Sequence, residues 1–163
     1  MKQRQNHNIE PVYDQNSKIL ILGSFPSVKS RESEFFYGHP QNRFWRVTSA
    51  VLECKCPENV SEKKEFLLSC GIAVWDVIKS CDIEGSSDSS ISNVVSNDIG
   101  RILGAADIRA VFTNGGTSTR LYKKFIQPKE GTPSVPLPST SPANARYTLE
   151  RLIRDWSKIK EFL

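Results

Sequence analysis

One segment, Phe35–Trp45, concentrates the aromatic side chains that could bind a flat ligand. Its eleven residues, FFYGHPQNRFW, hold five aromatic rings. Phe44 and Trp45 begin an apolar helical pattern, so we expect their rings to pack in the core. Tyr37 lies in a turn that contains Gly and Pro, where a ring can stand in a pocket and stack on a base. We expect His39, in the same turn, to make a structural hydrogen bond, and we keep it as a candidate pocket residue.

Three further segments combine small and hydroxyl-bearing residues, and each follows an apolar run. They are Gly23-Ser24-Phe25-Pro26-Ser27, Asn114-Gly115-Gly116 and Pro138-Ser139-Thr140-Ser141. A fourth apolar run ends at Asp76. Backbone N–H groups and Ser or Thr hydroxyls bind phosphate, although Gly, Ser and Pro also simply form turns. If the four runs are strands of one parallel sheet, these segments meet at its carboxyl edge, where ligands bind, and they then predict a phosphate-bearing ligand.

Several common catalytic and metal-binding signatures are absent. There is no GxxxxGKS or GxxxxGKT loop, no GxGxxG after the first apolar run and no GxSxG elbow, which disfavours a nucleotide hydrolase, a dinucleotide-binding enzyme and a serine hydrolase. The chain has two His residues, and its four Cys residues form no CxxC pair. We therefore expect no metal site, and we interpret the cysteines as reduced thiols.

The residues between these segments predict the elements that would position them. Short apolar runs predict strands at residues 18–23, 71–75, 108–113 and 133–137. Apolar spacing and capping residues predict helices at residues 42–54, 61–70, 98–103 and 117–125. We expect a last helix from Ser141 as the N-cap to Ile159, and a long loop at residues 81–96. The alternation predicts an α/β fold: a single three-layer domain with a central, mostly parallel four-stranded sheet flanked by helices.

The composition is that of an ordinary globular protein, because 38% of the 163 residues are hydrophobic and 25% are charged. The length indicates one domain over residues 1–163, with residues 1–10 expected to be a flexible N-terminal segment. No run approaches the ~20 apolar residues of a spanning helix, and the N-terminus has no apolar signal region, so we expect a cytoplasmic protein with no membrane partner. The net charge of +4 permits an anionic partner such as nucleic acid but does not require one.

The motifs resemble those of a known family. GSFPS at residues 23–27, YGHPQNRFW at residues 37–45 and LPSTSPAN at residues 137–144 are similar to the motifs of the uracil-DNA glycosylase superfamily. More narrowly, the combination of HPxNRFW with LPSTSPAN resembles the hypoxanthine-DNA glycosylase branch, family 6. The mismatch-specific uracil/thymine branch shares HPxNRFW but not the rest. The resemblance covers most of the chain, from about Pro11 to the last helix.

The resemblance implies a DNA glycosylase on a single α/β domain with a central parallel sheet. The expected activity is removal of a deaminated base, hypoxanthine above all and also uracil or xanthine, in base excision repair. The enzyme would flip the base out and hydrolyse its N-glycosidic bond. The expected partner is DNA that contains deaminated bases, no cofactor is implied, and we expect a monomer. A bifunctional enzyme would need a lysine that forms a Schiff base with the sugar. The three motifs contain no lysine, and Lys29 only lies beside the first of them, so we predict a monofunctional hydrolase.

The resemblance places catalysis on Asn42. In several branches the first motif carries an Asn or Asp that positions the attacking water, but Phe25 occupies that position here. The uracil-specific branch begins its second motif with a His, whereas Leu137 stands there and cannot donate a hydrogen bond to the leaving base. The hypoxanthine branch has its catalytic Asn in HPxNRFW, which is Asn42. Its carbonyl could accept a hydrogen bond from water and aim it at C1′. By position alone Asn42 would be a helix N-cap, and both roles stay open.

Further roles follow from the resemblance, residue by residue. Tyr37 would stack on the flipped base. The other residues expected around the base are Ser24, Phe25, His39, Asp76 and Asn114. The residues expected to contact DNA phosphates or the minor groove are Ser27, Ser30, Ser139, Thr140, Ser141, Asn144 and Arg146, with Lys123 and Lys124 as further electrostatic contacts. A turn or capping role stays open for Asp76 and Asn114.

Three other functions remain compatible with the sequence. The chain could be a non-catalytic module that binds damaged DNA, a mismatch-type uracil/thymine glycosylase, or an enzyme acting on free nucleosides or nucleotides. Base release from oligonucleotides separates a glycosylase from a binding module. Binding to DNA through phosphates weakens steeply with salt, which separates the DNA-directed functions from the small-molecule enzyme.

Overall fold

Four parallel strands form the central sheet of the structure, a computed structural model that describes residues 1–163. The strands are β2 (Ile19–Gly23), β3 (Ile72–Asp76), β6 (Ala110–Asn114) and β7 (Ser134–Leu137). Their order across the sheet is β3-β2-β6-β7, and every neighbouring pair is parallel. The four strands predicted from the sequence are these four. β2, β3 and β6 are apolar because they are buried along almost their whole length, whereas β7, at the edge of the sheet, is only partly buried.

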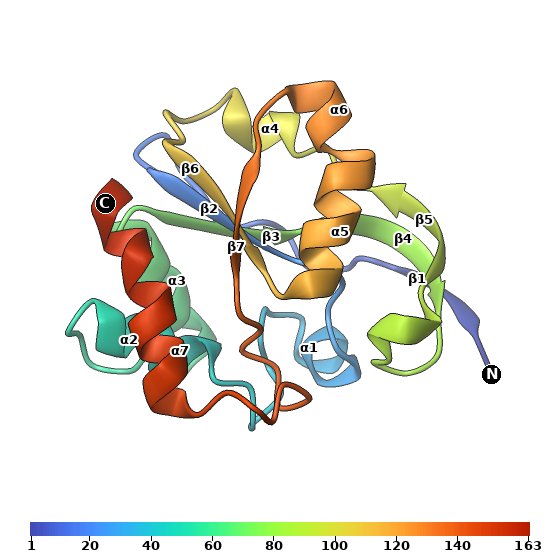
Figure 1. Cartoon of the computed structure of the whole chain (residues 1–163), viewed down its shortest axis with the longest axis horizontal. Coiled ribbons are helices and arrows are strands. Elements are labelled where there is room, and N and C mark those ends of the chain that lie inside the picture. The colour runs from blue at the N-terminus through green and yellow to red at the C-terminus, as the bar shows by residue number, and fades with distance from the viewer.

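Helices lie against both faces of the sheet, which gives the fold three layers (Figure 1). On one side lie α5 (Gly116–Phe125), α6 (Gln127–Glu130) and the single turn α4 (Gly100–Leu103). On the other side lie α2 (Phe44–Val51), α3 (Val60–Ser69) and α7 (Leu149–Trp156), with the short α1 (Val28–Ser33). Two 3₁₀ turns, η1 (Asp88–Ser90) and η2 (Ser157–Phe162), complete the helical elements. None of the helices combines the length and the apolar character needed to cross a membrane.

The four strands end level with one another at one edge of the sheet. Gly23, the last residue of β2, lies beside Asp76, the last residue of β3. Asn114 at the end of β6 lies beside Leu137 at the end of β7. The segments that follow these strands therefore gather at the carboxyl edge, which is where parallel sheets bind ligands.

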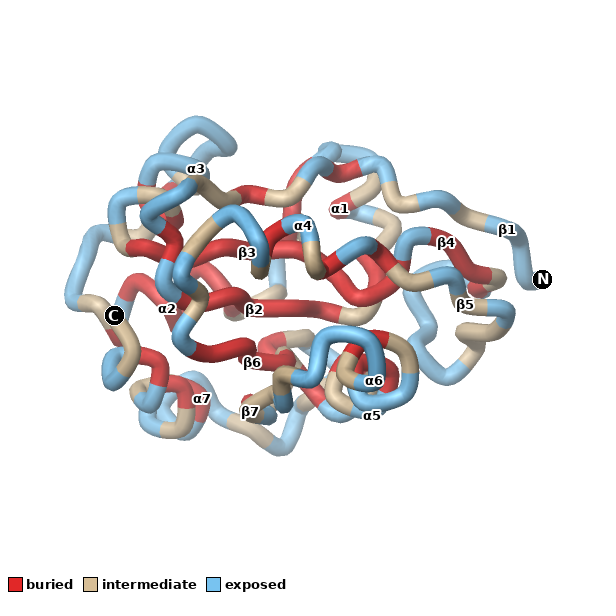
Figure 2. Tube along the Cα trace, turned by 90° about the horizontal axis from the view of Figure 1, so that it is seen from above, coloured by how far each residue is buried: buried red, intermediate tan, exposed pale blue.

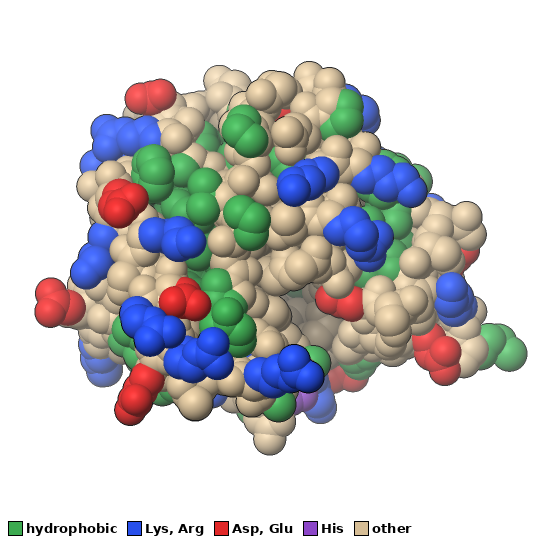
Figure 3. Space-filling view, in the orientation of Figure 1, with side chains coloured by type: hydrophobic (Ala, Val, Ile, Leu, Met, Phe, Trp, Pro, Cys, Tyr) green, Lys and Arg blue, Asp and Glu red, His purple; other side chains and the backbone are tan.

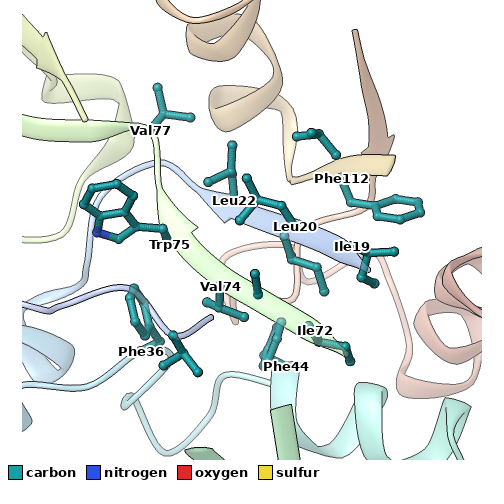
Figure 4. Close-up of a cluster of buried hydrophobic side chains, with 14 of the residues drawn as sticks. Ile19, Leu20, Leu22, Phe36, Phe44, Ile72, Val74, Trp75, Val77 and Phe112 are labelled. Carbon is teal, nitrogen blue, oxygen red and sulfur yellow. The ribbon is translucent and has the colours of Figure 1, made fainter. Parts of the chain in front are cut away.

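The core is built on β2 and β3, in which every residue is buried. Figure 2 shows buried residues running along the parallel strands and exposed residues along the outer turns of the helices. Phe44 from α2 faces Ile72 and Val74 of β3 (Figure 4). The Phe44 ring also meets Trp156 of α7 edge-on, with 5.8 Å between ring centroids. Phe44 and Trp45 pack inward, as the sequence predicts, and this packing fixes the start of α2 below the carboxyl edge.

A second, antiparallel sheet corrects two expectations. Its strands are β1 (Gln3–Asn6), β4 (Ile78–Ile83) and β5 (Ser92–Ser96), in the order β1-β4-β5. Residues 81–96, expected to be one loop, supply the second half of β4 and all of β5, and residues 1–10, expected to be flexible, contain β1. Gln3 pairs with Ile83 and Asn6 with Ser80. β1 and β5 are mostly polar, and β4 mixes the buried apolar residues Ile78, Cys81 and Ile83 with polar ones, so these strands form by pairing with distant partners and show no regular apolar periodicity.

The last helix begins later than expected. Its N-cap is Thr148, whose side chain accepts a hydrogen bond from the Arg151 N–H (3.2 Å), and not Ser141. The buried side of the predicted stripe is present, with Leu152, Trp156 and Ile159 fully buried. Residues 138–148 form a loop because a side chain from the start of α2, described below, binds several of their carbonyl groups.

Candidate active-site pocket

A cavity of about 510 Å³ opens at the carboxyl edge of the parallel sheet. Figure 3 shows a hollow in this region, below α5. The cavity is lined by the ends of β2, β3 and β6, by the turn before α2, by the loop after β7 and by residues 86–89. All residues that the sequence nominates for the site or for DNA contacts line the cavity except Lys123, Lys124, Asn144 and Arg146. The nominated residues that line the cavity come from five separate parts of the chain, at residues 24–30, 37–42, 76, 114 and 139–141.

Asn42 is joined to Asn114 through the hydroxyl group of Thr140. Asn114 Nδ2 donates to Thr140 Oγ1 (3.0 Å), and this hydroxyl donates to Asn42 Oδ1 (2.9 Å). The backbone N–H of Thr140 donates to Asn114 Oδ1 (3.0 Å). Thr140 is fully buried. The end of β6, the loop after β7 and the turn before α2 are therefore tied together at one point, and Asn42 is held in a single orientation.

The carbonyl oxygen of Asn42 is fully engaged within the protein. The backbone N–H of Phe44 also donates to it (2.9 Å), so both of its acceptor directions are occupied. This contact makes Asn42 the first residue of an Asx turn, while Arg43 takes the N-cap position of α2. The amide nitrogen Nδ2 makes no hydrogen bond to the protein, and Asn42 lines the cavity. Asn42 therefore presents hydrogen-bond donors to the cavity, and not the free carbonyl that the sequence analysis assigns to it.

Tyr37 supplies a fixed ring and a free hydroxyl group. Its ring stacks on Phe44, with 4.0 Å between centroids and 11° between planes. Its backbone lies in the left-handed region (φ 51°), a conformation that costs a non-glycine residue about 1–3 kcal/mol. Burial, reinforced by the Asp76 carboxylate, raises the pKa of the Tyr37 hydroxyl well above its usual value, and the Asn114 side chain opposes the shift. The buried hydroxyl has no hydrogen-bond partner of normal geometry, so it is a neutral donor that the protein leaves unsatisfied.

Asp76 lies deep in the cavity, with its side chain 5% exposed. Its Oδ2 atom is 2.8 Å from Nε2 of His7, whose side chain is 3% exposed. Its Oδ1 atom faces Gly23, where a Cβ atom would come within 2.5 Å of it. Glycine is required at position 23 because any side chain would displace the carboxylate. His7 was missed by sequence reasoning: its segment is polar, and nothing local shows that β1 carries it to the site.

The serine hydroxyls around the cavity shape the loops that carry them. Ser27 accepts a hydrogen bond from the Ser30 N–H as the N-cap of α1, and Ser30 Oγ accepts one from the Gly38 N–H (2.9 Å). In the loop after β7, Ser139 Oγ accepts from the Ser141 N–H and Ser141 Oγ accepts from the Ala143 N–H (both 3.1 Å). Because Ser139 and Ser141 act only as acceptors, their hydroxyl protons remain free to be donated to a phosphate.

Arg43 holds the loop after β7 in place. Its guanidinium group donates to the carbonyl oxygens of Tyr147, Ser141 (2.9 Å) and Asn144 (3.1 Å). Asn144 Nδ2 donates to the Ser139 carbonyl oxygen (3.0 Å), so this side chain folds back onto its own loop. Arg146 is exposed and lies outside the cavity. The loop is therefore a preformed ridge beside the cavity, with Pro142 and Ala143 exposed on its surface.

One side of the cavity mouth was not predicted from the sequence. The segment Ser86–Ser89, between β4 and β5, lines the cavity opposite the loop after β7. Asp88 in this segment accepts a hydrogen bond from Ser24 (3.2 Å). Burial raises the pKa of the Asp88 carboxyl, helped by the Asp76 charge and opposed by the Ser24 and Thr117 hydroxyls. His39 lines the rim, and its Nδ1 accepts from the Gln41 N–H (3.1 Å), as expected for a structural turn residue.

The cysteines lie away from this arrangement. Cys54, Cys56, Cys70 and Cys81 are free thiols, and none of them lines the cavity. No group of three His, Cys, Asp or Glu side chains is placed to hold a metal ion. The chemistry available in the cavity is therefore that of amide and hydroxyl donors, the carboxyl groups of Asp76 and Asp88, and aromatic faces.

Comparison with known proteins gives consistent matches over most of the chain. The model of the uracil DNA glycosylase superfamily matches residues 10–160. Two relatives called hypoxanthine DNA glycosylase, from Methanosarcina acetivorans and Methanosarcina barkeri, are 33% identical over 141 residues and 34% identical over 143 residues. Each alignment covers 86% of this chain and 89% of the relative.

A solved structure agrees with the architecture described above. The solution NMR structure of a candidate uracil DNA glycosylase from Methanosarcina acetivorans has a TM-score of 0.79 to this chain at 28% identity. The match covers 97% of this chain and 99% of that chain. The predicted α/β fold, with a four-stranded parallel sheet between layers of helices, is confirmed.

Proposed function

The chain belongs to the uracil-DNA glycosylase superfamily, and from that premise we propose that it is a DNA glycosylase that removes hypoxanthine from DNA. The target base is flipped out of the helix into the cavity at the carboxyl edge, and its N-glycosidic bond is hydrolysed. The observation that carries this proposal is the free amide of Asn42, held rigidly in a cavity that also contains an aromatic ring and a buried carboxylate. The cavity volume of about 510 Å³ falls within the range of about 300–1,000 Å³ that small-ligand sites occupy.

Asn42 acts in this proposal as a positioned hydrogen-bond donor. Cleavage of the glycosidic bond develops positive charge on the sugar and negative charge on the departing base, so donors near the base lower the barrier. Because Phe44 N–H and the Thr140 hydroxyl occupy the Asn42 carbonyl, Nδ2 is the group free to contact the base or the oxygen of a water molecule. An amide is a weak base, so its contribution is positioning and electrostatic stabilisation, and it does not remove a proton.

The role of Asn42 is tested by two substitutions with different predictions. We expect Asn42→Ala to lower the single-turnover rate of hypoxanthine release by at least about 100-fold, the size typical of losing one positioned donor. Asn42→Asp keeps the oxygen bound by Phe44 and Thr140 but replaces the donor with a second acceptor, so we expect the same loss. An Asn42→Asp enzyme that retains most of its rate would show that Asn42 acts as an acceptor for water.

The loop after β7 and the free hydroxyls of Ser139 and Ser141 would bind the DNA backbone beside the extruded nucleotide. Four further residues would support the same DNA-binding surface: Ser27, Ser30, Asn144 and Arg146. Ser27 and Ser30 would do so by stabilising α1 and the turn at Gly38. We propose that it acts as a monomer. No lysine lines the cavity, so we propose a monofunctional enzyme that leaves an abasic site. Trapping on DNA by borohydride would contradict this.

The decisive experiment measures base release from oligonucleotides that contain hypoxanthine, uracil, xanthine or a G·T mismatch. We expect release of hypoxanthine to be fastest, with uracil and xanthine as slower substrates. Release limited to uracil and the mismatched thymine would identify a mismatch-type enzyme. Binding to the modified DNA without any base release would identify a non-catalytic module. Release from free nucleosides, with little dependence on salt, would identify a small-molecule enzyme.

A further inference from the structure

The buried pair formed by His7 and Asp76 is the one ionisable cluster in the cavity that the proposed chemistry leaves without a role. His7 follows β1 and reaches Asp76 from the second sheet, without lining the cavity itself. Its ring lies among three aromatic rings, Phe25, Phe36 and Trp75, at centroid distances of 6.0, 6.1 and 6.3 Å. The surroundings are apolar except for Asp76, so the orientation of the imidazole is set by that carboxylate and by the backbone beside it.

The hydrogen bonds of His7 define which nitrogen carries the proton. The backbone N–H of Ile9 donates to Nδ1 (3.2 Å), so Nδ1 is an acceptor. Nε2 therefore carries the proton in the neutral ring and donates it to Asp76 Oδ2 (2.8 Å). This contact occupies one oxygen of the carboxylate and prevents its rotation. The other oxygen, Oδ1, makes no hydrogen bond to the protein.

Asp76 Oδ1 and the Tyr37 hydroxyl approach the same point above Gly23. A Cβ atom on residue 23 would lie 2.5 Å from Asp76 Oδ1 and 3.3 Å from Tyr37 Oη. The Tyr37 hydroxyl is a donor without a partner, and Asp76 Oδ1 is an acceptor without a partner. The inner end of the cavity thus presents one acceptor beside one donor.

This pair of groups matches the chemical change that deamination produces. Adenine and cytosine carry an unprotonated ring nitrogen beside an amino group, which is an acceptor next to a donor. Deamination of these two bases converts this edge into a ring N–H beside a carbonyl oxygen, a donor next to an acceptor, in hypoxanthine and uracil. A carboxylate oxygen accepts from the ring N–H, and a tyrosine hydroxyl donates to the carbonyl. Against adenine or cytosine the same carboxylate would face a lone pair, which is unfavourable.

We propose that His7 is a positioning residue that fixes the Asp76 carboxylate as the acceptor for the ring N–H of the extruded base, with the Tyr37 hydroxyl as the donor to the adjacent carbonyl oxygen. This inference rests on the proposed function and specifies the part of the base that the site recognises. It makes the N-terminal strand part of the active site, because β1 is what delivers His7 to Asp76. His7 acts only through Asp76 and does not contact the base.

The experiment uses the full chain and measures single-turnover release of hypoxanthine with enzyme in excess over DNA. We expect Asp76→Asn to lower the rate about 100-fold, because the amide that replaces Oδ1 presents a donor to the ring N–H. We expect His7→Leu, which keeps the bulk and removes the donor, to lower the rate about 10-fold. His7→Gln can place an amide N–H near the position of Nε2 and should stay within about threefold of wild type, whereas the shorter His7→Asn should resemble His7→Leu.

Two measurements separate positioning from a merely structural role. In the Asp76→Asn background, His7→Leu should change the rate by less than about twofold, because no acceptor remains to be positioned. The dissociation constant for the DNA should stay within about twofold of wild type in the His7 variants, because His7 lies beneath the base and away from the backbone.

The possible results decide between the explanations. Equal rates for wild type and a folded His7→Leu enzyme, or the same loss in both backgrounds, would overturn the inference and leave the proposed function intact. If His7→Leu does not fold, equal rates for His7→Gln and His7→Asn overturn it. A wild-type protein that releases no hypoxanthine overturns the proposed function itself, and the inference with it.

Discussion

Thr140 is the residue whose replacement tests most directly how the site is held together. Its hydroxyl group accepts from Asn114 Nδ2 (3.0 Å) and donates to Asn42 Oδ1 (2.9 Å), and the residue is fully buried. Thr140→Val removes this hydroxyl group and keeps the shape of the side chain. The backbone contact from the Thr140 N–H to Asn114 is kept as well. The substitution therefore isolates the hydroxyl bridge between the two asparagines.

The size of the effect follows from the two hydrogen bonds that are lost. Each contributes about 0.5–1.5 kcal/mol, so the free energy of unfolding should fall by about 2 kcal/mol. Asn42 Oδ1 keeps its bond from the Phe44 N–H, and Asn114 Nδ2 can bind water in the cavity, so neither group is left fully unpaired. For a domain of this length the melting temperature should fall by about 4–8 °C. Asn42 gains rotational freedom, and the rate of base release should fall about 10-fold.

Thr140→Ser is the matched control, because it keeps the hydroxyl and removes only the buried methyl group. It should lose about 1 kcal/mol of stability and keep a rate close to wild type. Urea unfolding and single-turnover base release, both at a temperature where all variants are folded, provide the comparison. Equal rates for Thr140→Val and Thr140→Ser would refute the positioning argument. A faster Thr140→Val enzyme would show that freeing the Asn42 carbonyl helps catalysis, and that this carbonyl is the productive group.

Three further predictions follow from other contacts of the site. Gly23→Ala places a methyl group 2.5 Å from Asp76 Oδ1, so the carboxylate must move. The rate of base release should fall at least about 10-fold, while the affinity for DNA, measured by fluorescence anisotropy, should be unchanged. Lysine in place of Arg43 has a single ammonium group and cannot bind several loop carbonyl groups at once. Arg43→Lys should therefore lower the free energy of unfolding by about 2 kcal/mol and weaken DNA binding. Unchanged values of both would contradict the role of Arg43 in anchoring the loop. Burial raises the pKa of Asp88, and DNA phosphates raise it further, so DNA binding takes up a proton and should tighten as the pH falls from about pH 8 to about pH 5. Asp88→Asn should bind more tightly at neutral pH and lose this part of the pH dependence; a parallel pH profile would exclude Asp88 as its source.

The sequence alone determined the central sheet and most of the residues around the cavity. β2, β3 and β6 were predicted because a strand buried on both faces needs a continuous apolar run, and such a run is a local signal. β7, a partly buried edge strand, was predicted from a short run between prolines. Once the strands are parallel, their carboxyl ends must meet, so the segments that follow Gly23, Asp76, Asn114 and Leu137 had to share one edge.

Only the tertiary structure decided how these residues act. The direction of the Asn42 amide depends on Thr140, 98 residues away in the chain, and the start of α7 depends on Arg43 binding the loop before it. β1, β4 and β5 form by pairing of segments that have no regular apolar periodicity, and His7 reaches Asp76, 69 residues away, only through that pairing. A buried helix or strand requires apolar residues at regular spacing in the sequence, whereas a single hydrogen bond between distant side chains produces no local sequence pattern. That is why the location of the site could be predicted from the sequence, while the donors, acceptors and positioning residues within it could not.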